Sequence, residues 1–144
     1  MTKAHNYLSQ ILSKTIDFYY IYRHFHWNIT TQDFYQFHTL FDSHAIMIFA
    51  SQDTLAERIR QLDFFVEQVK INVDTKMPDT QDNIQNILKF LFLEHQDIIK
   101  ILTDAIDYYS DKKDFATADM LTLFLVQHQK MSWFIKSSIK EESN

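Results

Sequence analysis

The absence of glycine limits this chain to very few folds. Its 144 residues include no Gly and a single Pro, the residue types on which most tight turns and sheet-rich folds depend. A chain of this length usually forms one domain with a substantial core, and 46% of its residues are apolar. We therefore predict a single all-α domain over residues 1–144, with no internal repeat or low-complexity segment.

Apolar residues at three- and four-residue spacings indicate helices. The predicted helices span residues 3–28, 34–62, 80–109 and 115–139. Asp33 is a candidate N-cap for the second helix, and Asp79 or Thr80 for the third. The segment between these helices contains Pro78 and has weaker periodicity, so we expect a long crossover that carries a possible short helix. This combination is typical of a ferritin-like four-helix bundle.

The lack of cysteine means that only imidazole and carboxylate groups are available to hold a metal ion. These ligands favour harder ions such as iron. The formal charge of −5 comes from 14 basic and 19 acidic residues, a balance that favours cations over nucleic acid as partners. No signal peptide and no apolar run of membrane-spanning length is evident. We therefore expect a cytoplasmic protein without a membrane partner.

The predicted helix 34–62 has two specialised faces, whereas a surface helix of a monomer needs only one. The first is an apolar heptad stripe that we expect to pack into the chain's own core, formed by Phe34, Phe41, Ile48, Leu55 and Leu62 together with Phe37 and Ile59. The second lies roughly 130° around the helix and consists of His38, Asp42, Ile46, Phe49, Asp53 and Glu57. Its polar residues form i,i+4 pairs of metal-ligand types, which predicts a metal site.

The two ligand pairs of the second face cannot share an ion within one chain. Asp42 and Asp53 are about 17 Å apart along a straight helix, whereas a ligand atom lies about 2 Å from its metal. The face is symmetric about its apolar centre, so antiparallel pairing of two copies brings His38 toward Glu57 and Asp42 toward Asp53 of the partner subunit. This predicts a two-fold homodimer with two mixed metal sites. His26, at the end of the first helix, is the natural further ligand.

These residues and their spacing resemble the Dps (DNA protection during starvation) family of mini-ferritins. The resemblance covers nearly the whole chain and includes His26-Trp27-Asn28, His38, Asp42, Asp53, Glu57-Arg58 and the segment from Thr117 to Thr122. It implies a dodecameric shell that oxidises Fe(II), preferably with hydrogen peroxide, stores Fe(III) mineral and protects against oxidative damage. It also implies two iron ions per inter-subunit site, with His26, His38 and Asp42 from one subunit and Asp53 and Glu57 from the other.

The resemblance suggests two further functional features. Trp27, beside His26, would relay electrons or quench radicals formed near the iron. Iron would reach the interior through acidic pores near the turn that follows the third helix, for which Asp111, Asp114 and Asp119 are the candidates. Each of these residues also has an ordinary interpretation, as a packed tryptophan or as helix-end acids placed by capping preferences.

The chain departs from the family in its loops and its termini. Thr31 and Asp63-Phe64 stand where family members often have glycine, so we expect altered loops with unchanged ligands. Members that bind DNA through a mobile tail carry several basic residues there, since these neutralise phosphates. Residues 1–7 contain one Lys, and residues 136–144 mix two Lys with two Glu. We therefore expect weak or no DNA binding by this route.

Other functions fit parts of this pattern. An intrachain di-iron enzyme uses Glu-x-x-His pairs, and no Glu of this chain has a His three residues later, which excludes that class. A nucleoid-associated DNA-binding shell with little redox chemistry is the main alternative, and DNA retention at physiological salt would favour it. A helical bundle without metal is the simplest alternative. The remaining histidines, among them His24, His44, His95 and His128, are interpreted as surface or core residues.

Overall fold

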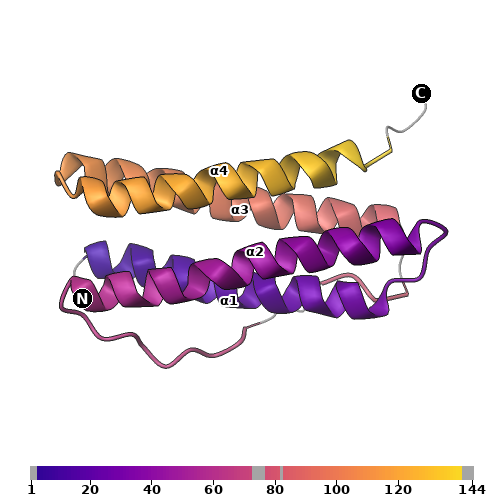
Figure 1. Cartoon of the computed structure of the whole chain (residues 1–144), viewed down its shortest axis with the longest axis horizontal. Helices are drawn as coiled ribbons and strands as arrows, with labels where there is room; N and C mark the ends of the chain where they lie inside the picture. Colours follow the sequence, from indigo (N-terminus) through magenta and orange to yellow (C-terminus); the bar gives the residue numbers. More distant parts are fainter. Residues whose placement is uncertain (1–2, 73–76, 82, 141–144) are drawn as a thin grey trace.

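A computed structural model describes residues 3–72, 77–81 and 83–140 of the chain. Four long helices dominate it, as the hydrophobic periodicity predicts (Figure 1). They are α1 (Lys3–Asn28), α2 (Phe34–Gln61), α3 (Ile84–Asp111) and α4 (Phe115–Ser137). The described residues contain no strand, which confirms the all-α prediction.

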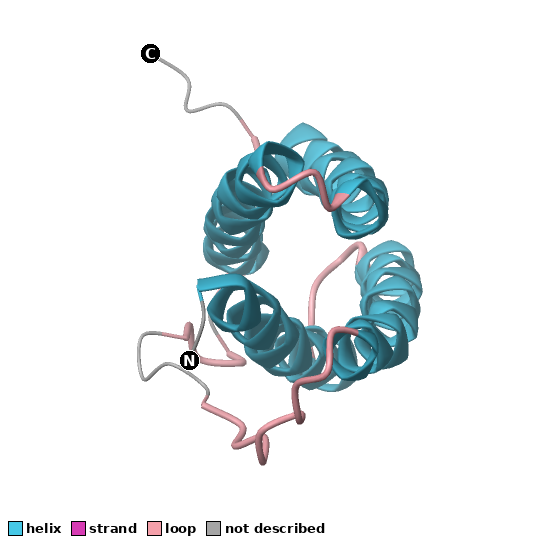
Figure 2. Cartoon of the chain, turned by 90° about the vertical axis from the view of Figure 1, so that its left-hand side faces the viewer, coloured by secondary structure: helices cyan, strands magenta, loops and turns pink. Residues whose placement is uncertain are grey.

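The helices form two antiparallel hairpins. α1 packs along α2 and α3 along α4, while contacts of α1 with α3 and of α2 with α4 close the bundle. α2 and α3 run in the same direction, so the connection between them has to return along the bundle (Figure 1). Figure 2 shows the four helices around a common centre. The bundle therefore has the long α2–α3 crossover that the sequence predicts.

The heptad stripe of α2 lies in the core, with one exception. Its central members are at most 1% exposed, and these are Phe41, Ile48, Leu55 and Ile59. Phe37 and Leu62 are partly buried against the same core. Phe34 was expected there too but is 43% exposed, because it is the first residue of α2 and stacks on the His38 ring, with ring centroids 4.8 Å apart.

α2 and α3 both end in a hydrogen-bonding pattern that usually places glycine in a left-handed conformation. At the end of α2, the amides of Asp63 and Phe64 donate to carbonyls one turn back, and Asp63 has φ 67°. At the end of α3, the amides of Lys113 and Asp114 do the same, and Lys113 has φ 62°. A residue with a β-carbon costs about 1–2 kcal/mol in this conformation. The chain thus keeps the usual helix endings without glycine, at a cost in stability.

The third helix begins later than predicted. α3 starts at Ile84, and its N-cap is Asn83, whose side chain accepts a hydrogen bond from the Asn86 amide at 3.0 Å. Asp79 and Thr80 were the predicted caps, but the Asp79 carboxylate instead accepts bonds from the two residues that follow it, in a turn. The capping prediction was wrong because several capping-type residues follow Pro78, and only the position nearest the apolar stripe begins the helix.

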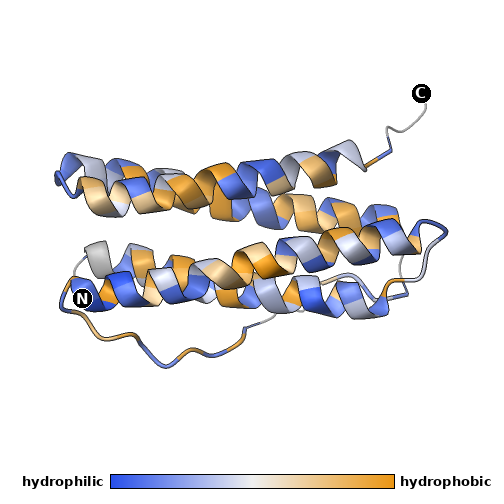
Figure 3. Cartoon of the chain, viewed as in Figure 1, coloured by the Kyte–Doolittle hydropathy of each residue, from blue (hydrophilic) through white to orange (hydrophobic). Residues whose placement is uncertain are grey.

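The described part of the crossover contains no helix. Residues 64–72 run along the α1–α2 hairpin, and the Asn72 amide donates to Asp17 Oδ1 at 2.9 Å. The short helix considered for this segment is therefore not found in the described residues, and residues 73–76 and 82 lie outside them. Figure 3 shows hydrophobic and polar residues interspersed along the helices. Within the part described, none of the helices has the length and apolarity needed to span a membrane.

Candidate metal centre

The connection between α1 and α2 brings His26 and His38 together. α1 ends at Asn28 and α2 begins at Phe34, so the last turn of one helix lies beside the first turns of the other. His26 Nδ1 lies 2.7 Å from the His38 carbonyl oxygen, and His38 Nδ1 lies 2.8 Å from the His26 carbonyl oxygen. The two rings stack with their centroids 3.9 Å apart and an interplanar angle of 16°. Two sequence-predicted ligands therefore meet as a reciprocal pair.

The reciprocal bonds define which ring nitrogens can bind a metal. A carbonyl oxygen only accepts hydrogen bonds, so Nδ1 carries the proton in both His26 and His38. In the neutral ring the lone pair then resides on Nε2, the atom left to ligate a metal. Metal-binding histidines commonly donate their other N–H to a carbonyl group, because this fixes the tautomer and the ring orientation. The backbone of the α1–α2 hairpin therefore leaves Nε2 of both imidazoles as the nitrogen that a metal could bind.

Asp42 lies one turn after His38 on α2 and forms an ion pair with Arg23. The Arg23 guanidinium donates to Asp42 Oδ1, and its Nε donates to the Tyr19 hydroxyl at 3.2 Å. The hydrogen bond from Arg23 is the main reason that the pKa of Asp42 is lowered, and the nearby His26 and His38 lower it further. Asp42 is therefore a carboxylate beside the histidine pair, and a cation that binds it has to displace or share the guanidinium.

The remaining predicted ligands, Asp53 and Glu57, are exposed on the same helix. Ile46 and Phe49, between the two ligand pairs, are 55% and 57% exposed, which is unusual for large apolar side chains in a folded monomer. In the described residues of this chain, no three His, Asp or Glu side chains are arranged to hold a metal ion. One chain thus presents the two ligand pairs on an exposed, partly apolar face without joining them.

The other residues predicted to act in iron handling differ in their surroundings. Trp27 is 62% exposed, directly after His26. Asp111 and Asp119 are exposed at the α3–α4 turn, whereas Asp114 is the N-cap of α4 and accepts bonds from Thr117 and Arg58. These contacts give Asp114 a structural role, as the capping interpretation anticipates. The relay and pore functions stay predictions.

Sequence reasoning missed a buried histidine cluster. His44, His95 and His128 are at most 4% exposed. His44 and His95 contact the fully buried Tyr22, and His128 contacts His95. Burial lowers the pKa of His44 to about 4 and of His128 to about 3, and it moves the pKa of His95 well below its usual range. The sequence does contain a signal for this burial, because each histidine takes a position in the apolar stripe of its helix.

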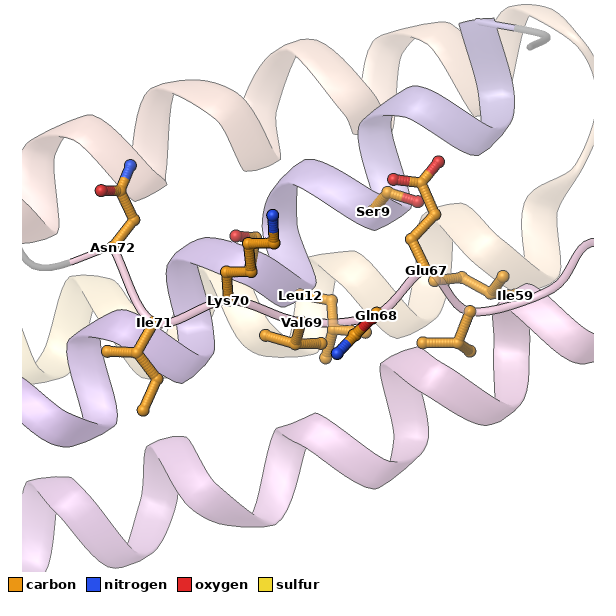
Figure 4. A pocket seen from close by; sticks show the side chains of 11 residues that line it. Ser9, Leu12, Ile59, Glu67, Gln68, Val69, Lys70, Ile71 and Asn72 are labelled. Atoms are coloured by element: carbon orange, nitrogen blue, oxygen red, sulfur yellow. The ribbon is translucent and has the colours of Figure 1, made fainter.

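A pocket without histidines lies beside the crossover. It is a cleft of about 550 Å³ between the crossover and the α1–α2 hairpin, lined by residues such as Leu12, Ile59, Glu67 and Lys70. Figure 4 shows the crossover side chains from Glu67 to Asn72 along its edge. Two of the sequence-predicted ligands meet instead at the α1–α2 connection, where we place the candidate site.

Comparison with known proteins places the chain in a family. Residues 5–143 match the family described as ferritin-like domain. The DNA protection during starvation protein of Agrobacterium fabrum is 26% identical over 141 residues, which cover 94% of this chain and 87% of that protein. The crystal structure of Dps from Thermosynechococcus elongatus has a TM-score of 0.87 at 24% identity and covers 98% of this chain and 92% of that one. The Dps protein of Vibrio cholerae, described as a member of the ferritin-like diiron-carboxylate superfamily, has a TM-score of 0.83 at 20% identity and covers 96% and 89% of the two chains. The chain therefore belongs to the ferritin-like family, as a mini-ferritin of the Dps type.

Proposed function

We propose that this protein is a ferroxidase and iron-storage protein whose di-iron sites form between two copies of the chain. Ferritin-like diiron-carboxylate proteins support iron storage and ferroxidase activity in general. The finer proposal is that His26, His38 and Asp42 of one subunit act with Asp53 and Glu57 of the other. Hydrogen peroxide is the preferred oxidant, and twelve subunits form the storage shell.

The reciprocal hydrogen bonding of His26 and His38 is the observation that carries this proposal. Surface histidines that merely interact with solvent have no need for two Nδ1–H bonds to each other's backbone. The exposed Ile46 and Phe49 support the two-fold pairing, because they lie between the two ligand pairs of α2 where a partner helix would cover them.

Each group has a chemical task in this scheme, with iron as the substrate. Neutral imidazoles bind Fe(II) without strongly favouring the trivalent product, whereas carboxylates favour Fe(III) and can bridge two ions. Two adjacent Fe(II) ions supply the two electrons that convert hydrogen peroxide and two protons into two water molecules. This stoichiometry avoids the one-electron reaction that releases hydroxyl radical.

Stopped-flow oxidation tests the ferroxidase function. Anaerobically loaded Fe(II) is mixed with hydrogen peroxide, and the native protein is compared with the double variant Asp53→Ala, Glu57→Ala. We expect a fast phase in the native protein and its loss in the variant. The matched control, Asp104→Ala, Asp107→Ala, removes two exposed acids from α3 and should keep the fast phase. Equal loss in both double variants, or a native rate no faster than free iron, would reject the proposed site.

Subunit mixing tests whether the site is shared. A variant with His26→Ala, His38→Ala and Asp42→Ala is co-refolded in equal amounts with the Asp53→Ala, Glu57→Ala variant. Each parent lacks every complete site, but a mixed dimer regains one of its two sites. Random pairing makes half of the dimers mixed, so we expect about a quarter of native activity from an isologous pair. An inactive mixture whose parents each assemble normally would contradict the shared site.

A further inference from the structure

A polar cluster occupies the centre of the apolar core, with one side chain from each helix. Tyr22 belongs to α1, His44 to α2, His95 to α3 and His128 to α4. Tyr22 and His95 have no exposed surface, while His128 keeps 4%. The Phe18 ring lies 4.5 Å from the His95 ring and 6.0 Å from the His128 ring, centroid to centroid. Polar groups in such surroundings are costly unless they are hydrogen-bonded to one another.

The cluster is a continuous hydrogen-bonded chain. His44 Nδ1 lies 3.0 Å from Tyr22 Oη, and the same oxygen lies 2.6 Å from His95 Nε2. His95 Nδ1 in turn lies 3.1 Å from His128 Nδ1. His95 therefore uses one ring nitrogen on each side, toward Tyr22 and toward His128, and links two neighbours across the core.

Two proton arrangements satisfy this chain equally. In one, Tyr22 donates to His95 Nε2, and His95 Nδ1–H donates to His128 Nδ1. In the other, His128 Nδ1–H donates to His95, and His95 Nε2–H donates to Tyr22, whose own proton turns toward His44. Every group is neutral in both arrangements. Conversion of the first into the second passes one proton from Tyr22 to His95 and one from His95 to His128, so one proton has to enter at the Tyr22 end and one has to leave His128 Nε2. The contact between His95 and His128 joins two identical groups, so neither imidazole has an intrinsic advantage in holding the proton.

A metal site does not explain the cluster. The described residues contain no group of three His, Asp or Glu side chains that could hold a metal ion, although three histidines lie here. The reason is geometric, because His95 directs its two nitrogens at different neighbours instead of one common point. Stability alone does not require these polar side chains, since apolar residues of similar volume often stabilise a core at least as well as buried polar groups.

We propose that Tyr22, His95 and His128 form a proton relay through the subunit core. A proton that arrives at Tyr22 Oη displaces the phenolic proton to His95 Nε2. His95 releases its Nδ1 proton to His128 Nδ1, and His128 releases its Nε2 proton. One proton enters and one leaves, and only O–H and N–H bonds form or break.

The relay begins close to the candidate metal centre. Tyr22 precedes His26 by four residues on α1, about 6 Å along the helix. Arg23, the next residue, pairs with Asp42. Resting on the proposed function, the relay would carry protons away from the di-iron site, because each Fe(II) that is oxidised by peroxide and hydrolysed to FeO(OH) releases two protons. His128, on α4, is the end from which they would leave.

An iron-free experiment tests the relay by itself. Solid-state ¹⁵N NMR of the assembled protein, labelled at histidine, reports which ring nitrogens carry protons. We expect His95 and His128 to exchange between two tautomers in the native protein and His95 to adopt a single tautomer in Tyr22→Phe, which removes one oxygen atom. Tyr109→Phe is the matched control, because Tyr109 is also buried but lies fourteen residues from His95 on α3, about 21 Å away along the helix. A single fixed tautomer of His95 in the native protein would overturn the proposal.

A second experiment connects the relay to iron chemistry. A pH-indicator dye follows proton release while Fe(II) is oxidised by hydrogen peroxide, for the native protein, Tyr22→Phe and His128→Asn. The Asn amide still accepts a bond from His95 but cannot pass a proton onward. We expect proton release to slow by about tenfold in both variants, with unchanged Fe(II) stoichiometry and an unchanged rate in Tyr109→Phe. Release at the native rate in both variants would refute the coupling to iron. Absence of iron oxidation in the native protein would contradict the proposed function and leave the NMR result to decide on the relay.

Discussion

Acidification should destabilise this protein well before its carboxylates are protonated, because of the buried histidines. Burial holds the pKa of His128 at about 3 and that of His95 well below its usual range. An unfolded histidine has a pKa of about 6.5. The unfolded chain therefore takes up protons as the pH falls below about 6.5, while the folded core does not. Stability is fully present above that pH and is lost as the pH falls toward the folded pKa values.

The loss in the free energy of unfolding depends on how far the pH lies below the pKa of an unfolded histidine. Each unit of pH costs about 1.4 kcal/mol for each histidine that stays neutral in the folded state. At about pH 5, His95 and His128 together reduce the free energy of unfolding by about 4 kcal/mol, and His44 adds to this. Domains of this kind are stable by only about 5–15 kcal/mol, so the effect is a large share of the total.

Urea unfolding at a series of pH values measures this effect. The slope of the unfolding free energy against pH between about 5 and 6.5 is compared for the native protein, His128→Asn and Tyr109→Phe at one protein concentration, since assembly affects stability. We expect the slope to fall by about 1 kcal/mol per pH unit in His128→Asn, because the unfolded histidine is only partly protonated near its pKa, and to stay unchanged in Tyr109→Phe. A slope that His128→Asn leaves unchanged would show that His128 is charged in the folded core, against this reasoning.

Three further predictions concern the surface and the turns. Phe49→Glu places like charges at the proposed two-fold centre, so light scattering should show dissociation of the dimer, and a variant that stays dimeric would exclude α2 pairing through this residue. Lys113→Gly removes the left-handed strain at the end of α3 and should raise the free energy of unfolding by about 0.5–1 kcal/mol, whereas a decrease would show that the Lys113 side chain is stabilising. At about 0.15 M salt, gel-shift assays should show no retention of duplex DNA, because the net charge is −5, and retention would favour the DNA-binding alternative.

The helices and the core could be predicted because periodicity reports directly on burial. The predicted bounds of α1 coincide with the structure, and α2 ends at Gln61 instead of residue 62. The start of α3 could not be predicted as well, because several residues after Pro78 have capping side chains, and tertiary packing selects Asn83. Phe34 belongs to the heptad pattern, but at the helix end its ring stacks on His38.

The candidate site was predictable in its residues but not in its hydrogen bonds. Spacing identifies His38 and Asp42 as neighbours on one helix face, and the place of His26 at the end of the first helix suggests it as a further ligand. No spacing rule predicts that the two histidines exchange hydrogen bonds with each other's carbonyl groups, because this depends on how the α1–α2 connection closes. The Arg23 ion pair with Asp42 is likewise a contact between two helices.

Hydrogen bonding of Nδ1 separates the two kinds of histidine in this chain. In His26 and His38, Nδ1 bonds to a backbone carbonyl, which only accepts, so the proton stays on Nδ1 and Nε2 is the nitrogen that would bind a metal in the proposed site. In His95 and His128 it is used on another imidazole, which can accept or donate, so the proton is shared and neither ring has a reserved nitrogen. Residue type alone cannot distinguish a ligand from a relay. The partner of Nδ1 does, and for this reason we propose opposite chemical roles for histidines that look equivalent in the sequence.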